Sequence, residues 1–251
     1  MAFLQAKQAA AVFAVLAFSA SPSHAQVLRQ QLEVWAAQCN NSERDYSLDD
    51  AERACTAIIR SDVATSPARS ASYRQRGAIR LERGDRAGAL ADFTEAVSHN
   101  PHSTPAYIGR AAIYEAQSEF ERAIADYDQV VRIAPESAAA YNARCWLRSR
   151  SGRQLNLAEA DCERAIELSG GAAAAYDTRG MLHLRGQRFD EAWRDYNSAI
   201  AREEGNAHYL YGRGIAALRL GRTEEGQADL TAALAIDPAI AAAYESYGMA
   251  P

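Results

Sequence analysis

The sequence predicts an all-α protein, a solenoid in which antiparallel helical hairpins stack one on the next. The first observation is a repeat: Tyr73, Tyr107 and Tyr141 are 34 residues apart, and Tyr176 follows 35 residues later. The second is a spacing of three and four residues between apolar positions, for example in residues 73–83, which is typical of one helix face. The third is that no copy shows the alternation of a strand. Because one hairpin cannot bury its apolar face alone, stacking is expected.

Residues 1–25 have the features of an export signal. Lys7 gives a positively charged start, residues 9–20 form an apolar run, and Pro22 breaks it before small residues that end at Ala25. The run is shorter than the about 20 residues that a transmembrane helix needs. The alternative is a buried N-terminal helix. We expect a mature protein without a membrane span, located in the periplasm or, alternatively, fully secreted.

Composition excludes several kinds of chemistry. The 251-residue chain has a net charge of −5, and its 27 basic residues are Lys7 and 26 arginines, so a mature chain without the signal has no lysine for Schiff-base or phosphate-loop roles. The mild acidity argues against nucleic-acid binding. A loose dinucleotide pattern at residues 212–217 falls inside a predicted helix, and His99 and His102 flank a turn without a third metal ligand. We therefore expect no cofactor, no metal and no catalysis.

Residues 70–238 contain five copies of the repeat. With the tyrosine as position 4, position 8 is small, position 20 is alanine and position 24 is aromatic in most copies. The members of these columns are Gly77, Ala111, Cys145 and Gly180; Ala89, Ala123 and Ala192; and Phe93, Tyr127 and Tyr196. The fifth copy carries Leu210, Gly214, Gly226, Leu230 and Pro238. Glycines predicted to form the turns between the two halves are Gly84, Gly152, Gly186 and Gly221.

This pattern resembles the tetratricopeptide repeat (TPR), a 34-residue helix–turn–helix unit. The resemblance implies a superhelix with a concave groove and a role in binding protein or peptide segments. One departure is consistent: the residue before the small position is arginine in all five copies. These arginines are Arg76, Arg110, Arg144, Arg179 and Arg213.

Each of these arginines has a matching aspartate at position 23. Since facing positions of an antiparallel hairpin have a roughly constant sum, positions 7 and 23 lie opposite each other. The predicted ion pairs are Arg76–Asp92, Arg110–Asp126, Arg144–Asp161, Arg179–Asp195 and Arg213–Asp229. A guanidinium binds a carboxylate with two parallel bonds. We expect these pairs to hold the helices in register; a ligand-binding role is the alternative.

Four cysteines indicate a further, degenerate hairpin within residues 26–69. Cys145 and Cys162 occupy positions 8 and 24, and the similarity of residues 51–59 to residues 158–166 gives Cys39 and Cys55 the same two positions. These positions lie at similar height in a hairpin, which predicts the disulfides Cys39–Cys55 and Cys145–Cys162. Four buried thiols are the alternative, whereas a metal site is disfavoured because no ligand pair lies nearby.

The resemblance also implies which residues line the groove, because the first helix of each TPR unit faces it. The implied partner-binding residues are Arg74, Ile108, Asn142, Trp146, Arg150, Met181, Arg185, Tyr211, Ile215 and Arg219. An apolar stripe beside arginines suits an acidic, partly hydrophobic segment. The alternative is that Trp146 and Met181 are packing residues and the arginines a solvated face.

Residues 239–251 begin like a sixth copy, with Tyr244 and Gly248, and are expected to form a helix that caps the last apolar face. The sequence thus predicts an exported, non-catalytic protein–protein interaction scaffold. The alternatives are a cell-envelope enzyme or cell-wall glycan binder that uses groove carboxylates such as Asp177, and a self-associating structural protein. The identity of the partner and the oligomeric state do not follow from the sequence.

Overall fold

A computed structural model describes residues 24–41, 44–152 and 154–251, and these residues form thirteen α-helices and no strand. The predicted export signal lies outside the described residues except for its last two, which begin the first helix. None of the described helices has both the length and the apolar character needed to cross a membrane. The predicted all-α fold class is confirmed.

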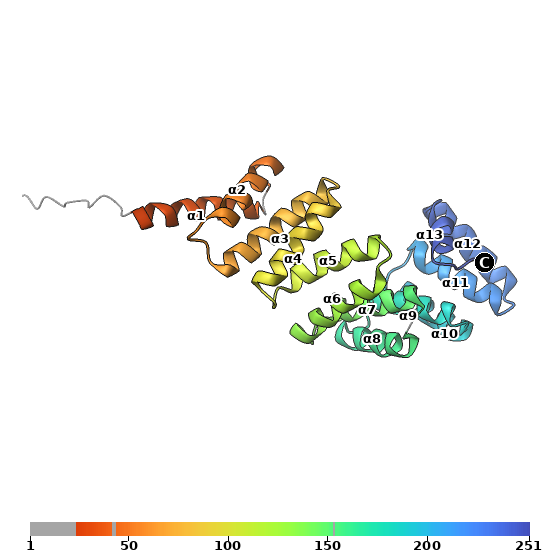
Figure 1. Cartoon of the computed structure of the whole chain (residues 1–251). Helices are drawn as coiled ribbons and strands as arrows, with labels where there is room; N and C mark the ends of the chain where they lie inside the picture. Colours follow the sequence, from red (N-terminus) through yellow and green to blue (C-terminus); the bar gives the residue numbers. More distant parts are fainter. Residues whose placement is uncertain (1–23, 42–43, 153) are drawn as a thin grey trace, which may run out of the picture.

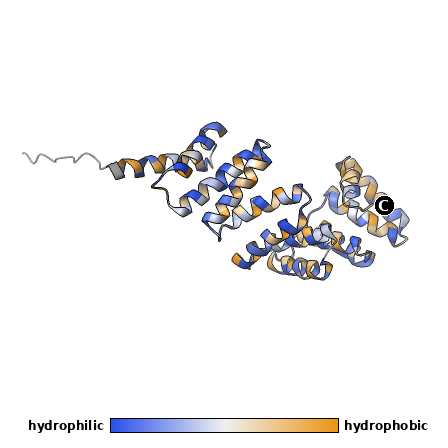
Figure 2. Ribbon diagram, in the orientation of Figure 1, coloured by the Kyte–Doolittle hydropathy of each residue, from blue (hydrophilic) through white to orange (hydrophobic). Residues whose placement is uncertain are grey.

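The helices form six antiparallel hairpins followed by one short helix (Figure 1). Their bounds are α1 His24–Asn40, α2 Leu48–Arg60, α3 Ser66–Glu82, α4 Arg86–His99, α5 Thr104–Ala116, α6 Phe120–Ile133, α7 Ala138–Ser151, α8 Leu155–Leu168, α9 Ala173–Arg185, α10 Phe189–Ile200, α11 Ala207–Arg219, α12 Thr223–Ile236 and α13 Ile240–Ser246. From α1 to α12 each helix packs against the next one in the chain. Hydrophilic and hydrophobic residues occur side by side on the helices (Figure 2), as expected where each hairpin is buried only by its neighbours.

The helix that opens the first full repeat, α3, begins at Ser66. Thr65 caps α3 by accepting a hydrogen bond from the Ala68 N–H at 3.3 Å, and Pro67 lies in the first turn. Both features favour a helix start at Ser66, because the cap satisfies an amide that has no partner within the helix and proline needs no donor there.

In the five full repeats, the turn between the two helices has a left-handed residue at position 15, whether or not that residue is glycine. At position 15, Gly84, Ser118 and Gln187 all have a left-handed φ, of 81°, 60° and 56° respectively. The residue after each donates its N–H back across the helix end, for example from Arg188 to the His183 carbonyl at 2.9 Å. Gly186, predicted as the turn residue of its copy, instead has an ordinary φ of −77°. The hairpin geometry therefore decides which residue adopts the left-handed conformation, even where glycine is one position away.

Glycines on the first helices allow an aromatic side chain of the preceding hairpin to pack against the backbone. A Cβ on Gly109 would lie 2.5 Å from the Phe93 ring, and one on Gly212 would lie 2.2 Å from the Tyr196 ring. These aromatic rings are almost completely buried. The absence of a side chain at Gly109 and Gly212 therefore allows successive hairpins to approach each other closely at these two places.

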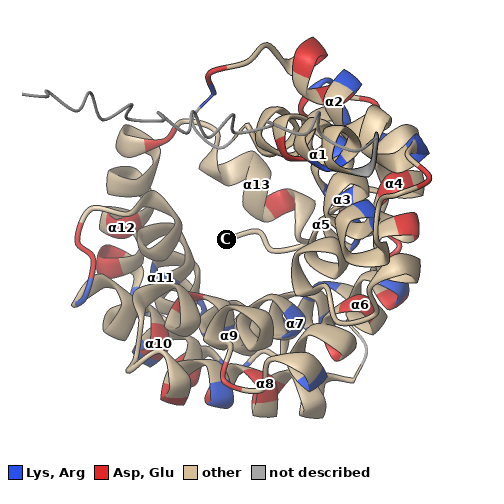
Figure 3. Cartoon of the chain, turned by 90° about the vertical axis from the view of Figure 1, so that its left-hand side faces the viewer, with Lys and Arg blue, Asp and Glu red and all other residues tan. Residues whose placement is uncertain are grey.

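The stacked hairpins curve into a ring when viewed along the superhelix axis (Figure 3), with α5, α7, α9 and α11 inside and α6, α8, α10 and α12 outside. The short helix α13 and the C-terminus lie within this ring. Two apolar residues of α12, Leu234 and Ile236, remain 40% and 53% exposed. The capping role expected for residues 239–251 stays a prediction, since this segment packs into the concave side and leaves part of α12 uncovered.

Candidate functional site

The recurring arginine and aspartate form a two-bond pair in every full repeat. Each guanidinium donates from Nε and Nη2 to the two carboxylate oxygens, at 2.9 and 2.7 Å in Arg76–Asp92 and at 2.9 and 2.6 Å in Arg110–Asp126. The other three pairs, Arg144–Asp161, Arg179–Asp195 and Arg213–Asp229, have distances between 2.5 and 3.0 Å. All five aspartates are buried, so each needs its partner.

A third contact of these arginines was not anticipated from the sequence. The remaining terminal nitrogen, Nη1, reaches back to the preceding hairpin: from Arg76 to Thr56 Oγ1 at 3.0 Å, and from Arg213 to Asn197 Oδ1 at 2.9 Å. The acceptors share position 25, directly after the aromatic or cysteine position. Its polar members are Thr56, Thr94, Asp128, Glu163 and Asn197. This polar column was the available signal in the sequence, and its contacts mean that Arg76, Arg110, Arg144 and Arg213 each join three helices of two hairpins.

Hydrogen bonding within these pairs shifts the pKa of the arginines and, in the pair Arg179–Asp195, also that of the aspartate. The hydrogen bonds that Arg110 donates to Asp126 raise the pKa of Arg110, and those that Arg76 donates to Asp92 raise the pKa of Arg76. Burial alone would raise the pKa of Asp195, but hydrogen bonds from His183 and Arg179 outweigh burial and lower it. These hydrogen bonds favour the charged forms of the arginines and of Asp195, which suits a structural role in register.

The cysteines lie in two hairpin-closing pairs. Cys39 on α1 is bonded to Cys55 on α2 with an S–S distance of 2.08 Å, and Cys145 on α7 to Cys162 on α8 at 2.02 Å. All four side chains are buried. Each bond joins the two helices of one hairpin, which are also the pairings expected from the repeat positions.

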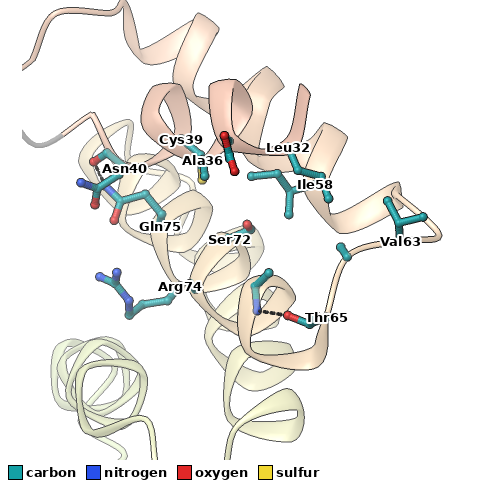
Figure 4. A pocket seen from close by; sticks show the side chains of 14 residues that line it. Leu32, Ala36, Cys39, Asn40, Ile58, Val63, Thr65, Ser72, Arg74 and Gln75 are labelled. Carbon is teal, nitrogen blue, oxygen red and sulfur yellow. Dashed lines mark hydrogen bonds between the residues drawn. The ribbon is translucent and has the colours of Figure 1, made fainter. Parts of the chain in front are cut away.

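The N-terminal half of the concave face is open and apolar. A pocket of about 320 Å³ lies between α1, the end of α2 and α3 (Figure 4), where Leu32 and Ile58 line it. Arg74, one of the implied partner-binding residues, lies at its edge beside Gln75, which donates to the Asn40 carbonyl at 2.9 Å. Further along the groove, Ile108 on α5 is 42% exposed. Sequence reasoning did not identify this pocket, because it forms between a degenerate hairpin and a full repeat.

The C-terminal half of the same face carries larger side chains. Met181, Tyr211 and Ile215 are 0%, 4% and 3% exposed and belong to the hydrophobic core, as the packing alternative supposes. Asn142 on α7 is half-buried, and its side-chain oxygen has no hydrogen-bond partner within the part of the chain that the structure describes. The remaining members, Trp146, Arg150, Arg185 and Arg219, are half-buried or exposed.

These four residues contact the chain's own C-terminal segment. The Tyr247 ring meets Trp146 edge-on, with centroids 5.2 Å apart, and the Arg150 guanidinium lies over the same tyrosine at 5.4 Å. Arg185 donates to the Tyr247 carbonyl and Arg219 to the Ala250 carbonyl, each at 3.1 Å. The superhelix therefore brings residues from α7, α9 and α11 together around one short segment.

A carboxylate on α5 fixes the first part of this arrangement. Glu115 accepts hydrogen bonds from Trp146 Nε1 at 2.8 Å and from Arg150 Nη1 at 3.1 Å. The indole and the guanidinium, which lies 5.5 Å above the indole ring, are thus held as a preformed platform. Such a cationic and aromatic surface attracts another ring by cation–π and edge contacts.

Asp177, the groove carboxylate suggested for an enzyme or glycan binder, is engaged inside the protein. It lies 2.9 Å from His208 Nδ1, and the Tyr244 hydroxyl donates to the His208 carbonyl at 2.8 Å. Burial raises the pKa of Tyr244 well above its usual range. Within the described residues no group of three or more His, Cys, Asp or Glu side chains could hold a metal ion.

Comparison with known proteins gives a consistent family signal. Two family models described as tetratricopeptide repeat match residues 80–147 and 178–241. No curated protein matches the chain. A tetratricopeptide repeat protein from Parabacteroides merdae ATCC 43184 superposes with a TM-score of 0.71 at 22% identity, covering 86% of this chain and 88% of that chain.

Two further solved structures have the same fold. YrrB, described as a TPR protein with an unusual peptide-binding site, gives a TM-score of 0.60 at 20% identity, covering 79% of this chain and all of that chain (100%). The MamA protein gives a TM-score of 0.59 at 20% identity, covering 72% of this chain and 97% of that chain. At these identities the likeness concerns the fold.

Proposed function

This chain is a tetratricopeptide repeat protein, and from that premise we propose that it is an exported, non-catalytic scaffold that binds a peptide or protein segment in its concave groove. The fold itself suggests a protein–protein interaction scaffold. The proposal goes beyond the fold in three respects. The protein is exported, the concave groove is its binding surface, and the ligand is a peptide or protein segment.

The observation that supports the groove is its contact with residues 247–250. Two arginines donate to main-chain carbonyls and an aromatic platform receives a side chain, which are contacts that any extended segment can use. YrrB is described as having a peptide-binding site, so binding of peptides occurs on a related fold. The open half beside Ile108 offers further apolar surface for a partner.

Two features support export. The first 25 residues resemble a signal peptide, and the two disulfides are typical of an oxidising compartment such as the periplasm. We expect the mature protein to begin at Gln26 and to be recovered in the periplasmic fraction, which N-terminal sequencing of the purified protein would establish. An unprocessed cytoplasmic protein would contradict this part of the proposal.

The groove is tested by site-specific photocrosslinking in the producing cells. A photoreactive residue replaces Ile108 in the open half of the groove, or Leu157 on the outer helix α8 as a control of similar exposure, 42% and 44%. We expect a discrete protein adduct from the groove position and none from the control position. Equal adducts from both positions, or none from either, would contradict groove binding.

A further inference from the structure

The C-terminal segment enters the groove through a defined turn. At the end of α13 the Gly248 N–H donates to the Glu245 carbonyl at 2.8 Å and the Met249 N–H to the Tyr244 carbonyl at 3.0 Å. Gly248 has a φ of +73°, which glycine adopts without strain. The pair of bonds reverses the chain direction, so that residues 247–251 run back along the concave side.

The helix that carries this segment is attached more firmly than the segment itself. On α13, Ile240 and Tyr244 are almost completely buried, and the Tyr244 ring packs 4.9 Å from the Tyr211 ring. Beyond Gly248, Met249 is buried, but Ala250 and Pro251 are exposed. Tyr247 ends α13 in a helical conformation, so residues 247–251 leave the groove by fraying of this helix end after Ser246, while the buried Ile240 and Tyr244 keep the rest of α13 in place.

The segment offers the two arginines that contact it only neutral hydrogen-bond acceptors. Arg185 and Arg219 are exposed, and each donates to a neutral carbonyl. Neither has a carboxylate partner among the described residues, in contrast to Arg150, which pairs with Glu115 at 3.1 Å. Together with Met249 they line a cavity of about 350 Å³. A carboxylate in this place would gain charge-assisted bonds, which are roughly twice as strong as neutral ones.

We propose that residues 247–251 are a built-in competitor for the groove, displaced by a partner segment that carries an aromatic residue followed by an acidic one. The aromatic ring takes the place of Tyr247 on the platform of Trp146 and Arg150, and the carboxylate binds between Arg185 and Arg219. This inference rests on the proposed function and narrows it, because it names the chemistry of the segment. A tethered competitor acts at a high effective concentration, so only a segment with better contacts displaces it.

The test uses short peptides as probes and two forms of the protein. The first probe has the sequence of residues 245–251; the second carries Ala250→Asp, which directs a carboxylate at Arg219; and the control probe carries Ser246→Asp, which adds the same charge outside the cavity. Affinities are measured by fluorescence polarisation for the full chain and for a chain that ends at Ser246. Circular dichroism verifies that both forms are folded.

We expect the shortened chain to bind the Ala250→Asp probe about tenfold tighter than the full chain does, because its groove is unoccupied. The same probe should exceed the control probe on the shortened chain by about fivefold at low salt, and the difference should shrink as salt screens the charges. Arg219→Ala should remove that difference. Equal affinities for both protein forms, or for both acidic probes, would overturn the inference.

Two variants keep the test decisive if the shortened chain does not fold. Full-length Tyr247→Ala should bind the acidic probe more tightly than the unmodified chain, because its segment lacks the ring that contacts Trp146. Full-length Ala250→Asp should bind the probe more weakly, because its own segment then holds Arg219 better. Opposite or absent effects would again overturn the inference.

The outcomes separate this inference from the proposed function. If a protein is crosslinked at Ile108 but shortening the chain does not increase peptide binding, the scaffold function is supported and the competitor role of residues 247–251 is refuted. If shortening the chain increases peptide binding but no protein is crosslinked at Ile108, the competitor role is supported and the scaffold function is refuted. If light scattering shows a dimer that the shortening abolishes, the segment occupies the groove of a second copy, and the intramolecular competitor is overturned.

Discussion

The two halves of the concave face are built from the same repeat but are occupied differently. In the N-terminal half, position 9 is Ala78 or Ala112, both exposed, and an apolar pocket stays open. In the C-terminal half, position 9 is Trp146, Met181 or Ile215, and the chain's own end covers these large side chains. The residues that hold the hairpins together and the residues that line the groove therefore vary independently. The arginine–aspartate pairs, here called the framework, are the same in both halves, whereas the side chains at the groove positions differ.

The largest expected effect breaks the shared framework. Asp126→Ala leaves Arg110 largely buried without its carboxylate, which should lower the free energy of unfolding by about 3–5 kcal/mol. Asp229→Ala should cost a similar amount in the C-terminal half, if the framework is indeed shared. Urea denaturation measures both.

The matched control for this prediction is Asp128→Ala. The Asp128 side chain is 46% exposed and makes peripheral ion pairs with Arg144 and Arg148, so its loss should cost about 1 kcal/mol or less. Equal costs for Asp126→Ala and Asp128→Ala would mean that the recurring two-bond geometry of the arginine–aspartate pairs contributes little to stability.

Reduction of the disulfides should have the next largest effect. Cys39–Cys55 and Cys145–Cys162 close loops with sequence separations of 16 and 17, and each should stabilise its hairpin by about 3 kcal/mol. Peptide mass spectrometry without reductant checks the pairing, and urea denaturation with and without reductant checks the energy. Unpaired thiols, or a link between Cys39 and Cys145, would refute the pairing. A Cys39→Ser/Cys55→Ser variant should destabilise the N-terminal half and leave the C-terminal half unchanged.

A smaller effect is expected where the hairpins approach each other closely. Gly109→Ala in the N-terminal half and Gly212→Ala in the C-terminal half each force a Cβ into an aromatic ring, which should cost about 1–3 kcal/mol. The cost should be larger at Gly212, because the displaced Tyr196 also accepts a hydrogen bond from Tyr244. The control Gly186→Ala meets only ordinary contacts at 3.5 Å or more and should be neutral or slightly stabilising. Thermal denaturation of the three variants ranks them.

The smallest effect concerns acid. The pKa of Asp195 is lowered from 3.8, so the folded state binds this proton more weakly than the unfolded state does. Its contribution to stability is therefore complete above about pH 3.8 and is lost as the pH falls through the lower folded value. Urea midpoints measured down to about pH 2.5 should fall, and Asp195→Asn should flatten this dependence. An unchanged slope in the variant would show that other carboxylates dominate.

Much of the framework could be predicted from the sequence, because the paired side chains lie within one hairpin. Partners such as Arg110 and Asp126 are 16 residues apart in one hairpin, so a recurring column at fixed positions predicts which side chains face each other. The third contact, to Thr56 or Asn197 of the preceding hairpin, was missed although its polar column is present. That column becomes meaningful only when the packing of successive hairpins is known.

The repeat can be read from the sequence alone: the all-α class, the family resemblance, the facing arginine and aspartate positions, and the positions of the cysteines. The state of the groove, in contrast, depends on the tertiary structure. Arg185 and Tyr247 are 62 residues apart, and no periodic signal connects them. Their contact depends on the curvature summed over several hairpins, which brings α7, α9 and α11 around a single segment. Local spacing fixes the hairpins, whereas long-range shape decides what they enclose.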